Sequence, residues 1–216
     1  MKNILCFGDS NTYGYNANKT GWGDRRFPLD VRWPGRLQLS LGSDYHIIEE
    51  GLCGRTMVFD DPALPGRRGL DWLIPCIETH LPLDLIILML GTNDVKAIFN
   101  APVQNLAAGL DVMLRTLRGF FAGKDLDTPH ILVVAPPPIG EKIDGSWLAG
   151  EFDEGSVIRS RQLAGFYANV AEANKCRFFD ASSATQLDPD ECVHMDADGC
   201  RKLASALERI IRDIFS

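Results

Sequence analysis

The clearest signal in this chain is its first segment, Lys2-Asn3-Ile4-Leu5-Cys6-Phe7-Gly8-Asp9-Ser10-Asn11-Thr12-Tyr13-Gly14. Residues 4–7 are all apolar, which predicts a strand buried on both faces. Gly8 lets the chain leave strand geometry without a side-chain clash. Ser10 then follows the carboxyl end of the strand, where open α/β sheets bind their ligands. Ser10 is therefore a candidate nucleophile, and a helix cap is the other interpretation of the same serine.

The rest of the chain alternates apolar strand patterns with amphipathic helix patterns. Further strands are predicted at residues 45–50, 85–90, 131–135 and 177–180, and helices at 33–41, 70–80, 102–121, 156–174 and 197–215. Pro75 is expected to kink or break its helix, and Asp196 is expected to cap the last one. Such alternation implies parallel strands with right-handed crossovers. The predicted fold is a three-layer α/β/α sandwich around a five-stranded parallel sheet, in a single domain spanning residues 1–216.

Three segments, residues 11–31, 57–69 and 139–155, are predicted loops. The first contains Tyr13, Tyr15, Trp22 and Phe27, and no helix or strand period fits it. It emerges at the Ser10 end of the sheet, and long ordered loops are often functional. Its aromatic side chains have two interpretations, which are the lining of a substrate entrance and the anchoring of the loop itself.

Composition and charge exclude several classes of function. The net charge is −7 and the isoelectric point is near 5.1, which argues against binding a phosphate backbone. No apolar run reaches the length of a membrane span, and the first residues lack the pattern of a signal peptide. The six cysteines show neither a CxxC pair nor zinc-site spacing: Cys6, Cys53, Cys76, Cys176, Cys192 and Cys200. Six cysteines could form three disulfides, but Cys6 and Cys76 lie in apolar segments, where a reduced, buried thiol is typical, so we expect a cytoplasmic protein with reduced thiols.

Glycine-containing turns follow several of the predicted strands. They comprise the Gly8-Asp9-Ser10 turn, residues 51–54 with Gly54, and residues 91–94 with Asn93. The carboxyl ends of parallel strands lie on one edge of a sheet, so Ser10, Gly54 and Asn93 are expected to converge.

A serine nucleophile needs a base, and the chain has four histidines. His46 and His130 fall within or beside strands, away from the Ser10 edge, and His80 closes a helix, where its charged form favours the dipole. His194 lies between the fifth strand and the last helix, on the same edge as Ser10. Topology therefore selects His194 as the candidate base.

These blocks resemble the SGNH (GDSL-type) hydrolases. Gly8-Asp9-Ser10 matches the nucleophile block of that family, Gly54 the glycine block, residues 91–94 the asparagine block and His194 the histidine block. The four occur in order over nearly the whole chain. Longer stretches are similar to the mycobacterial aryl esterase/acyltransferase subgroup: residues 6–10, 30–33, 49–52, 80–85, 89–94 and 133–138.

The resemblance implies the flavodoxin-like SGNH fold and a role for each block. Ser10 is expected to attack an ester carbonyl, with His194 as general base and then general acid. The backbone amides of Ser10 and Gly54 and the side-chain amide of Asn93 are expected to form the oxyanion hole. Asp9 and Asp94 are interpreted as hydrogen-bond scaffolding for their turns.

One position departs from the family pattern. The family usually has Asp three residues before the histidine, and this chain has Glu191 there. Glutamate orients imidazole in hydrolases of other folds. Glu191 is the favoured triad acid, with Asp190 and Asp188 as alternatives, and a dyad without a working acid also stays open.

The resemblance implies a serine esterase for small aryl or short-chain esters, with acyl transfer to alcohols or peroxide as a further reaction. Alternatives are a non-catalytic acyl- or carbohydrate-binding module, a thioesterase and a carbohydrate acetylesterase. We expect no cofactor and no metal site, since the histidines and acids lack ligand spacing. Expected partners are a small-molecule ester and other copies of the chain in a homo-oligomer, with neither nucleic acid nor a membrane span. Five loop residues are expected to shape the substrate pocket: Tyr13, Trp22, Lys96, Ile139 and Trp147.

Overall fold

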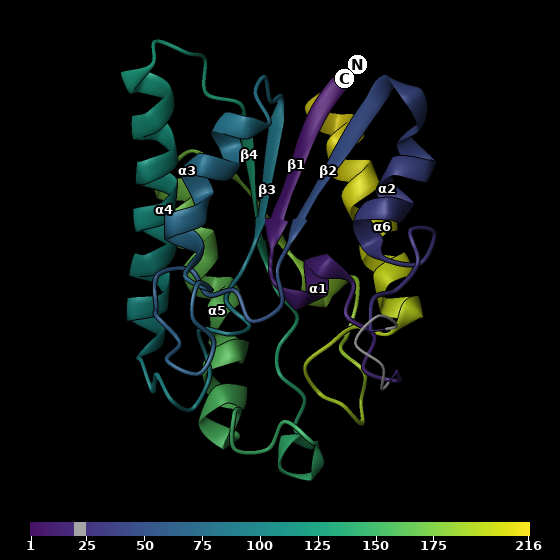
Figure 1. The fold of residues 1–216 in the computed structure, drawn as a ribbon, viewed down its shortest axis with the longest axis vertical. Helices are drawn as coiled ribbons and strands as arrows, with labels where there is room; N and C mark the ends of the chain where they lie inside the picture. The colour runs from purple at the N-terminus through teal and green to yellow at the C-terminus, as the bar shows by residue number, and fades with distance from the viewer. Residues whose placement is uncertain (20–24) are drawn as a thin grey trace.

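The computed structural model describes residues 1–19 and 25–216 and has a parallel β-sheet at its centre (Figure 1). Its strands are β1 (Lys2–Gly8), β2 (Tyr45–Gly51), β3 (Leu85–Met89), β4 (His130–Ala135) and β5 (Arg177–Asp180). They are parallel in the order β2-β1-β3-β4-β5. Flavodoxin-like sheets have this order, with the ligand crevice where it reverses, between β1 and β3. The predicted fold is confirmed.

Helices cover both faces of the sheet (Figure 1). One layer contains α3 (Gly69–Thr79), α4 (Val103–Gly123) and α5 (Glu154–Ala173), and the other contains α2 (Trp33–Leu41) and α6 (Ala197–Ile214). Alternate side chains of β1 enter two separate cores. Leu5 and Phe7 pack in the core on the α3–α4–α5 side, and Ile4 and Cys6 in the core on the α2–α6 side. The absence of polar residues from positions 4–7 of β1 follows from this burial on both faces.

Two helix ends are fixed by side chains. Asp196 caps α6 as predicted, because its Oδ1 accepts a hydrogen bond from the Gly199 amide at 2.6 Å. Asp153 forms a capping box with Ser156, which starts α5 two residues before the predicted position. 

Of the kink or break expected at Pro75, the break does not occur, because α3 continues through the proline. Leu73 and Ile77, on either side of the proline, are fully buried in the core. We attribute the continuity to this packing, which outweighs the hydrogen bond that proline removes.

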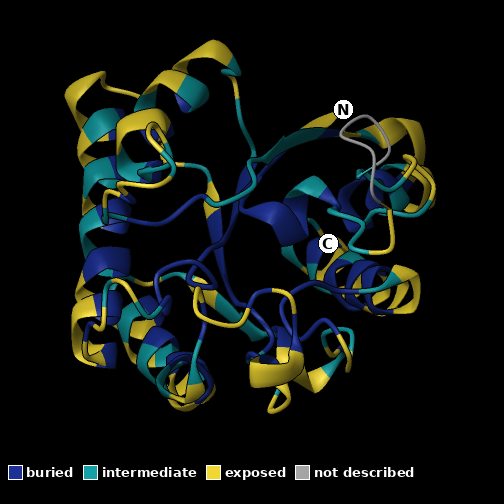
Figure 2. Cartoon of the chain, turned by 60° about the horizontal axis from the view of Figure 1, so that its bottom comes forward, coloured by how far each residue is buried: buried dark blue, intermediate teal, exposed yellow. Residues whose placement is uncertain are grey.

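The carboxyl ends of the strands and the loops that follow them gather at the lower edge of the molecule in Figure 1. The short helix α1 (Ser10–Tyr13) lies there, directly after β1, and the sequence pattern did not predict it. Three 3-10 turns complete the chain: η1 (Gly42–Asp44), η2 (Ile143–Gly145) and η3 (Ala181–Ser183). Figure 2 brings this edge forward and shows α1 mostly buried among the surrounding loops.

The structure also bears on the expectations about membrane spans and cysteine thiols. None of the described helices combines the length and the apolar character needed to cross a bilayer. All six cysteines are free thiols in the structure.

Candidate active site

The candidate nucleophile lies in a tight turn between β1 and α1. A Cβ atom on Gly8 would lie 2.1 Å from the Oγ1 of Thr12, so this position requires glycine. Asp9 is the N-cap of α1, and its Oδ1 accepts a hydrogen bond from the Asn11 amide at 2.9 Å. Ser10 is therefore the first helical residue rather than the cap, which leaves its hydroxyl free of any capping role.

Ser10, His194 and Glu191 form a continuous chain of short contacts. The Oγ of Ser10 lies 2.9 Å from Nε2 of His194, and Nδ1 of the same ring lies 2.6 Å from Oε1 of Glu191. With the Nδ1 proton donated to Glu191, Nε2 accepts the hydroxyl proton of Ser10. All three residues are buried. The arrangement is that of a nucleophile, a base and an orienting acid.

The Glu191 carboxylate is held in its charged form. Burial by itself would raise its pKa, but the hydrogen bond and charge of His194 outweigh burial and lower the pKa from its usual value. Its other oxygen, Oε2, accepts the backbone amides of Val193 at 2.9 Å and His194 at 2.6 Å. The carboxylate is thus fixed by three hydrogen bonds and is ionised at neutral pH.

Two further residues hold His194 in place: Asn11, which sequence reasoning did not single out, and Tyr15, one of the aromatic residues noted in the first loop. The Asn11 side chain donates to the carbonyl of Val193 at 3.1 Å and accepts from the amide of Met195 at 2.9 Å. Tyr15 lies against the imidazole, with 4.4 Å between ring centroids. Asn11 follows the nucleophile directly in the sequence, and that adjacency was the one signal available for finding it.

Three hydrogen-bond donors surround Ser10 Oγ in the same cavity. Gly54 has a φ of +79°, which favours glycine, and a Cβ there would lie 2.8 Å from Leu64. The side-chain nitrogen of Asn93 donates to the Arg55 carbonyl at 3.1 Å, which orients the amide and leaves its second N–H free. In residues 1–19 and 25–216, the backbone amides of Ser10 and Gly54 donate to no protein acceptor. Three N–H groups are thus available to a substrate oxygen.

A cavity of about 350 Å³ opens above Ser10 and His194. Tyr13, Lys96 and Trp147 line it, as the sequence suggested, whereas Trp22 lies outside the described residues. The ammonium of Lys96 is buried between Asp61 at 3.0 Å and Glu151 at 3.1 Å, so it is neutralised. Tyr15, one of the loop aromatics with a substrate entrance as one interpretation, also lines the cavity. Further wall residues that sequence reasoning missed are Arg25, Leu64, Leu148, Glu151 and Phe152.

Comparison with known proteins assigns a family to this chain. The sequence profile of the GDSL-like lipase/acylhydrolase family matches residues 6–202. The chain belongs to this family. None of the curated proteins compared with this GDSL-like hydrolase matches it.

Several solved structures resemble this GDSL-like hydrolase over almost its whole length. The aryl esterase of M. smegmatis is 40% identical, with a TM-score of 0.91, and the match covers 99% of this chain and 100% of that one. A carbohydrate acetylesterase from Sinorhizobium meliloti is 34% identical, with a TM-score of 0.90 and coverage of 99% and 100%. A putative arylesterase from Agrobacterium tumefaciens is 35% identical, with a TM-score of 0.87 and the same coverage. The protein is an ester-hydrolysing enzyme.

The other acids near His194 in the GDSL-like hydrolase have different contacts. Asp188 Oδ1 accepts the backbone amides of Asp190 at 2.9 Å and Glu191 at 3.0 Å, so it caps the loop turn. The Asp190 side chain is exposed and lies 3.9 Å from Lys142. Among these three acids, Glu191 is the one whose carboxylate contacts the imidazole.

Asp9 and Asp94 are buried carboxyl groups with scaffolding contacts. Asp9 caps α1, and Asp94 supports a distant segment, because its Oδ1 accepts the Met57 amide at 2.8 Å. Burial raises the pKa of Asp9 to about 6 and that of Asp94 to about 7. Neither carboxylate contacts the His194 ring.

Ile139 does not line the cavity above Ser10. Its side chain is 2% exposed and belongs to the core on the α3–α4–α5 side. Its amide donates to the Oγ of Ser160 at 3.0 Å, which ties this segment to α5. The interpretation of Ile139 as a pocket residue is therefore corrected, since the loop turns the apolar side chain inward rather than toward substrate.

Proposed function

We propose that this hydrolase is a serine esterase that cleaves small carboxylic esters through an acyl-enzyme at Ser10. The observation that carries this proposal is the contact of Ser10 Oγ with His194 Nε2 at 2.9 Å, continued by Glu191 at 2.6 Å. The three groups come from opposite ends of the chain and meet in a cavity large enough for a small ester.

The geometry allows a two-step reaction. Ser10 Oγ attacks the ester carbonyl carbon while His194 takes the hydroxyl proton, and Glu191 stabilises the imidazolium that forms. The oxyanion accepts hydrogen bonds from the Ser10 amide, the Gly54 amide and the Asn93 side chain. His194 then protonates the leaving alcohol. A water, deprotonated by His194, attacks the acyl-enzyme and releases the acid.

The cavity favours a short acyl or aryl group. Its volume of about 350 Å³ is at the small end of ligand pockets, and Tyr13, Tyr15 and Trp147 give it aromatic walls. An alcohol or peroxide that replaces water in the second step would give acyl transfer, which we include in the proposal. Two of the structural relatives are named as an aryl esterase and a carbohydrate acetylesterase, and these names define the two substrate classes to compare.

A carbohydrate acetylesterase is the second candidate, favoured by polar groups in the cavity wall. Arg25 and Glu151 line the cavity together with Lys96, and such groups hydrogen-bond sugar hydroxyls. Initial rates on p-nitrophenyl acetate, acetylated sugars and acyl thioesters discriminate the classes. We expect the highest kcat/KM on the aryl ester, and a higher value on acetylated sugars would assign the second class.

Ser10→Ala tests the nucleophile. We expect kcat/KM on p-nitrophenyl acetate to fall by at least about 10⁴-fold, since removing the nucleophile of a triad has effects of that size. A fluorophosphonate should label the parent at Ser10 and leave the variant unlabelled. Circular dichroism melts of both proteins serve as the folding control, and activity within tenfold of the parent would rule out the assignment.

The proposal includes a homo-oligomer and keeps the cytoplasmic location as a prediction of the sequence. Trp147 is 61% exposed although it stands at the cavity wall. A second copy that covers this side chain would complete the cavity entrance. Light scattering should give a multiple of the chain mass of 23.9 kDa at micromolar concentration, and a monomer mass would contradict it.

A further inference from the structure

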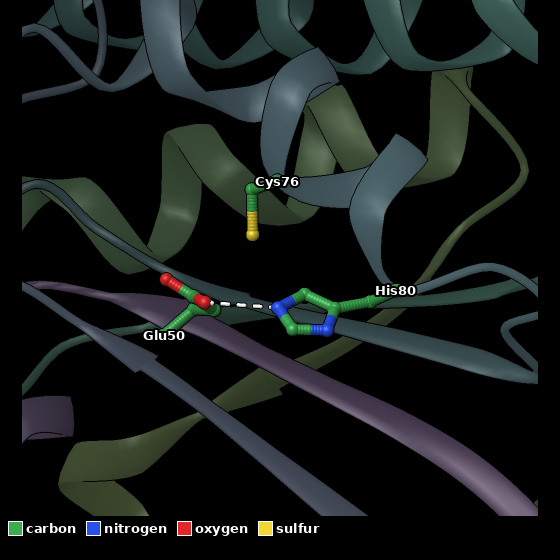
Figure 3. Close-up of side chains that lie close together, drawn as sticks. All are labelled: Glu50, Cys76 and His80. Carbon is green, nitrogen blue, oxygen red and sulfur yellow. Dashed lines mark hydrogen bonds and ion pairs between the residues drawn. The ribbon is translucent and has the colours of Figure 1, made fainter.

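A second cluster of chemically active side chains lies between β2 and α3 (Figure 3). Glu50 comes from the end of β2, Cys76 from α3 and His80 from the carboxyl end of the same helix. Glu50 Oε1 and His80 Nε2 are 3.0 Å apart, and Figure 3 shows the Cys76 sulfur directed toward this pair. None of the three residues lines the cavity above Ser10.

The cluster has the donor set of a zinc site. A carboxylate oxygen, an imidazole nitrogen and a thiolate sulfur are the groups that Zn²⁺ binds in proteins. One ligand atom from each of the three residues lies within 4.8 Å of the other two. Within the part of the chain that the structure describes, it is the one group of three such residues at this spacing.

The spacing is close to what a tetrahedral ion requires. Zinc–ligand distances of about 2.0–2.3 Å place neighbouring ligand atoms about 3.3–3.6 Å apart. The Glu50 and His80 atoms already lie 3.0 Å apart, and a sulfur within 4.8 Å must move by about 1 Å at most. Cys76 and His80 are four residues apart at the end of one helix, so both side chains project from the same face.

Access and charge also fit a cation. The side chains of His80 and Glu50 are 31% and 33% exposed, so an ion enters from solvent without opening the fold. Glu50 and a Cys76 thiolate supply two negative charges, which match those of Zn²⁺. The nearby guanidinium of Arg55 donates to the carbonyls of Gly8, at 2.9 Å, and Glu50. The Arg55 guanidinium is therefore held by backbone carbonyls and not by an ion pair with the Glu50 carboxylate, which stays available to a metal ion.

We propose that Glu50, Cys76 and His80 form a zinc-binding site that joins β2 to α3. Binding forms one Zn–S, one Zn–N and one Zn–O bond, displaces water from the ion and releases the Cys76 thiol proton to solvent. Three protein ligands leave the fourth position to water. The site lies outside the cavity, so its role is to stabilise the fold, and the metal-free enzyme keeps its ester hydrolysis.

Cobalt and zinc titrations test the site. Protein stripped with a chelator is titrated with Co²⁺, whose bond to thiolate gives a charge-transfer band in the near ultraviolet, and Zn²⁺ is then added as a competitor. We expect one equivalent of Co²⁺ to produce the band and Zn²⁺ to remove it. Zinc should also raise the melting temperature, because a ligand that binds the folded state stabilises it.

Variants connect the signal to the three ligands. Cys76→Ser should abolish the charge-transfer band, and His80→Gln and Glu50→Gln should each weaken zinc binding by at least about tenfold, the effect of losing 1.4 kcal/mol. Unchanged hydrolysis of p-nitrophenyl acetate shows that each variant is folded. That readout is separate from metal binding, so failure of the zinc proposal leaves the esterase proposal intact.

Two matched controls complete the experiment. Cys176→Ser removes another half-buried cysteine, and His194→Gln removes the other histidine that contacts a glutamate. Both should bind cobalt and zinc as the parent does. Absence of saturable binding in the parent, a band that survives in Cys76→Ser, or binding lost in a control variant would each overturn the proposal.

Discussion

The protein contains two pairs of a histidine and a glutamate, and they differ in every feature that matters for chemistry. His194 and Glu191 are 2.6 Å apart and their side chains are 9% and 8% exposed. His80 and Glu50 are 3.0 Å apart and their side chains are about one third exposed. Each pair has a potential nucleophile beside it, which is Ser10 in the first case and Cys76 in the second.

The difference shows that a histidine–acid pair becomes a catalytic base only in a suitable setting. Glu191 is fixed by two backbone amides as well as by the imidazole, and the ring opens onto a cavity with free N–H donors. The second pair does not line that cavity. Burial, with a contribution from the Glu50 charge, raises the pKa of Cys76 to about 12, so this thiol is no nucleophile at neutral pH.

The two glutamates give the sharpest test of this comparison. We expect Glu191→Gln to lower kcat/KM by roughly 10²–10⁴-fold, because the amide keeps the shape but removes the charge that stabilises the imidazolium. Glu50→Gln is the matched control and should leave activity within about twofold of the parent. Both are measured on one ester at fixed pH.

Variants of neighbouring acids complete that test. Glu191→Asp should retain partial activity, since the shorter side chain leaves a gap of about one methylene to the ring. Asp188→Asn and Asp190→Asn should have mild effects, because their carboxylates point elsewhere. A large loss of kcat/KM in Asp188→Asn or Asp190→Asn, together with unchanged kcat/KM in Glu191→Gln, would reassign the triad acid. Unchanged kcat/KM in all three variants would mean that His194 works without a carboxylate.

Asn93→Ala tests the N–H donors that line the cavity beside the pair of His194 and Glu191. We expect kcat to fall by roughly 10²–10³-fold, the usual effect of removing one oxyanion donor. The KM should change little, because the hydrogen bond strengthens as charge develops in the transition state. A large rise in KM with an unchanged kcat would show that Asn93 binds the substrate instead.

Asp94 differs from Glu191 and Glu50, because its carboxyl group is fully buried and is not paired with a histidine. Its pKa of about 7, against 3.8 for the ordinary group, means that the folded state binds more protons than the unfolded state over this range. Its contribution to stability therefore falls as pH rises from about 4 to about 7. Asp94→Asn keeps an acceptor for the Met57 amide and should remove this slope, with a gain at pH 8 of at most about 4 kcal/mol. Urea unfolding at pH 5 and pH 8 measures it, and equal slopes in parent and variant would contradict the assignment.

Much of the fold and part of the site could be predicted because the signals were local. The apolar run of residues 4–7 and the glycine after it identified the strand β1 and its end, and topology alone excluded His46 and His130 as bases. Other outcomes had a different origin. The helix α3 continues through Pro75 beside the buried Leu73 and Ile77, and Ile139 turns into the core, because buried contacts with distant elements outweigh the local pattern.

The sequence by itself determined the order of strands and helices, the glycine turns and the family, because these depend on residues close together in the chain or on short blocks in fixed order. Only the tertiary structure decided which of Asp188, Asp190 and Glu191 contacts His194, that Asn11 clamps the histidine loop, and that Glu50 meets Cys76 and His80. The first depends on the direction of side chains within one loop, and the other two depend on distances of a few ångströms between separate elements. Such directions and distances are fixed by tertiary packing, which no local pattern encodes.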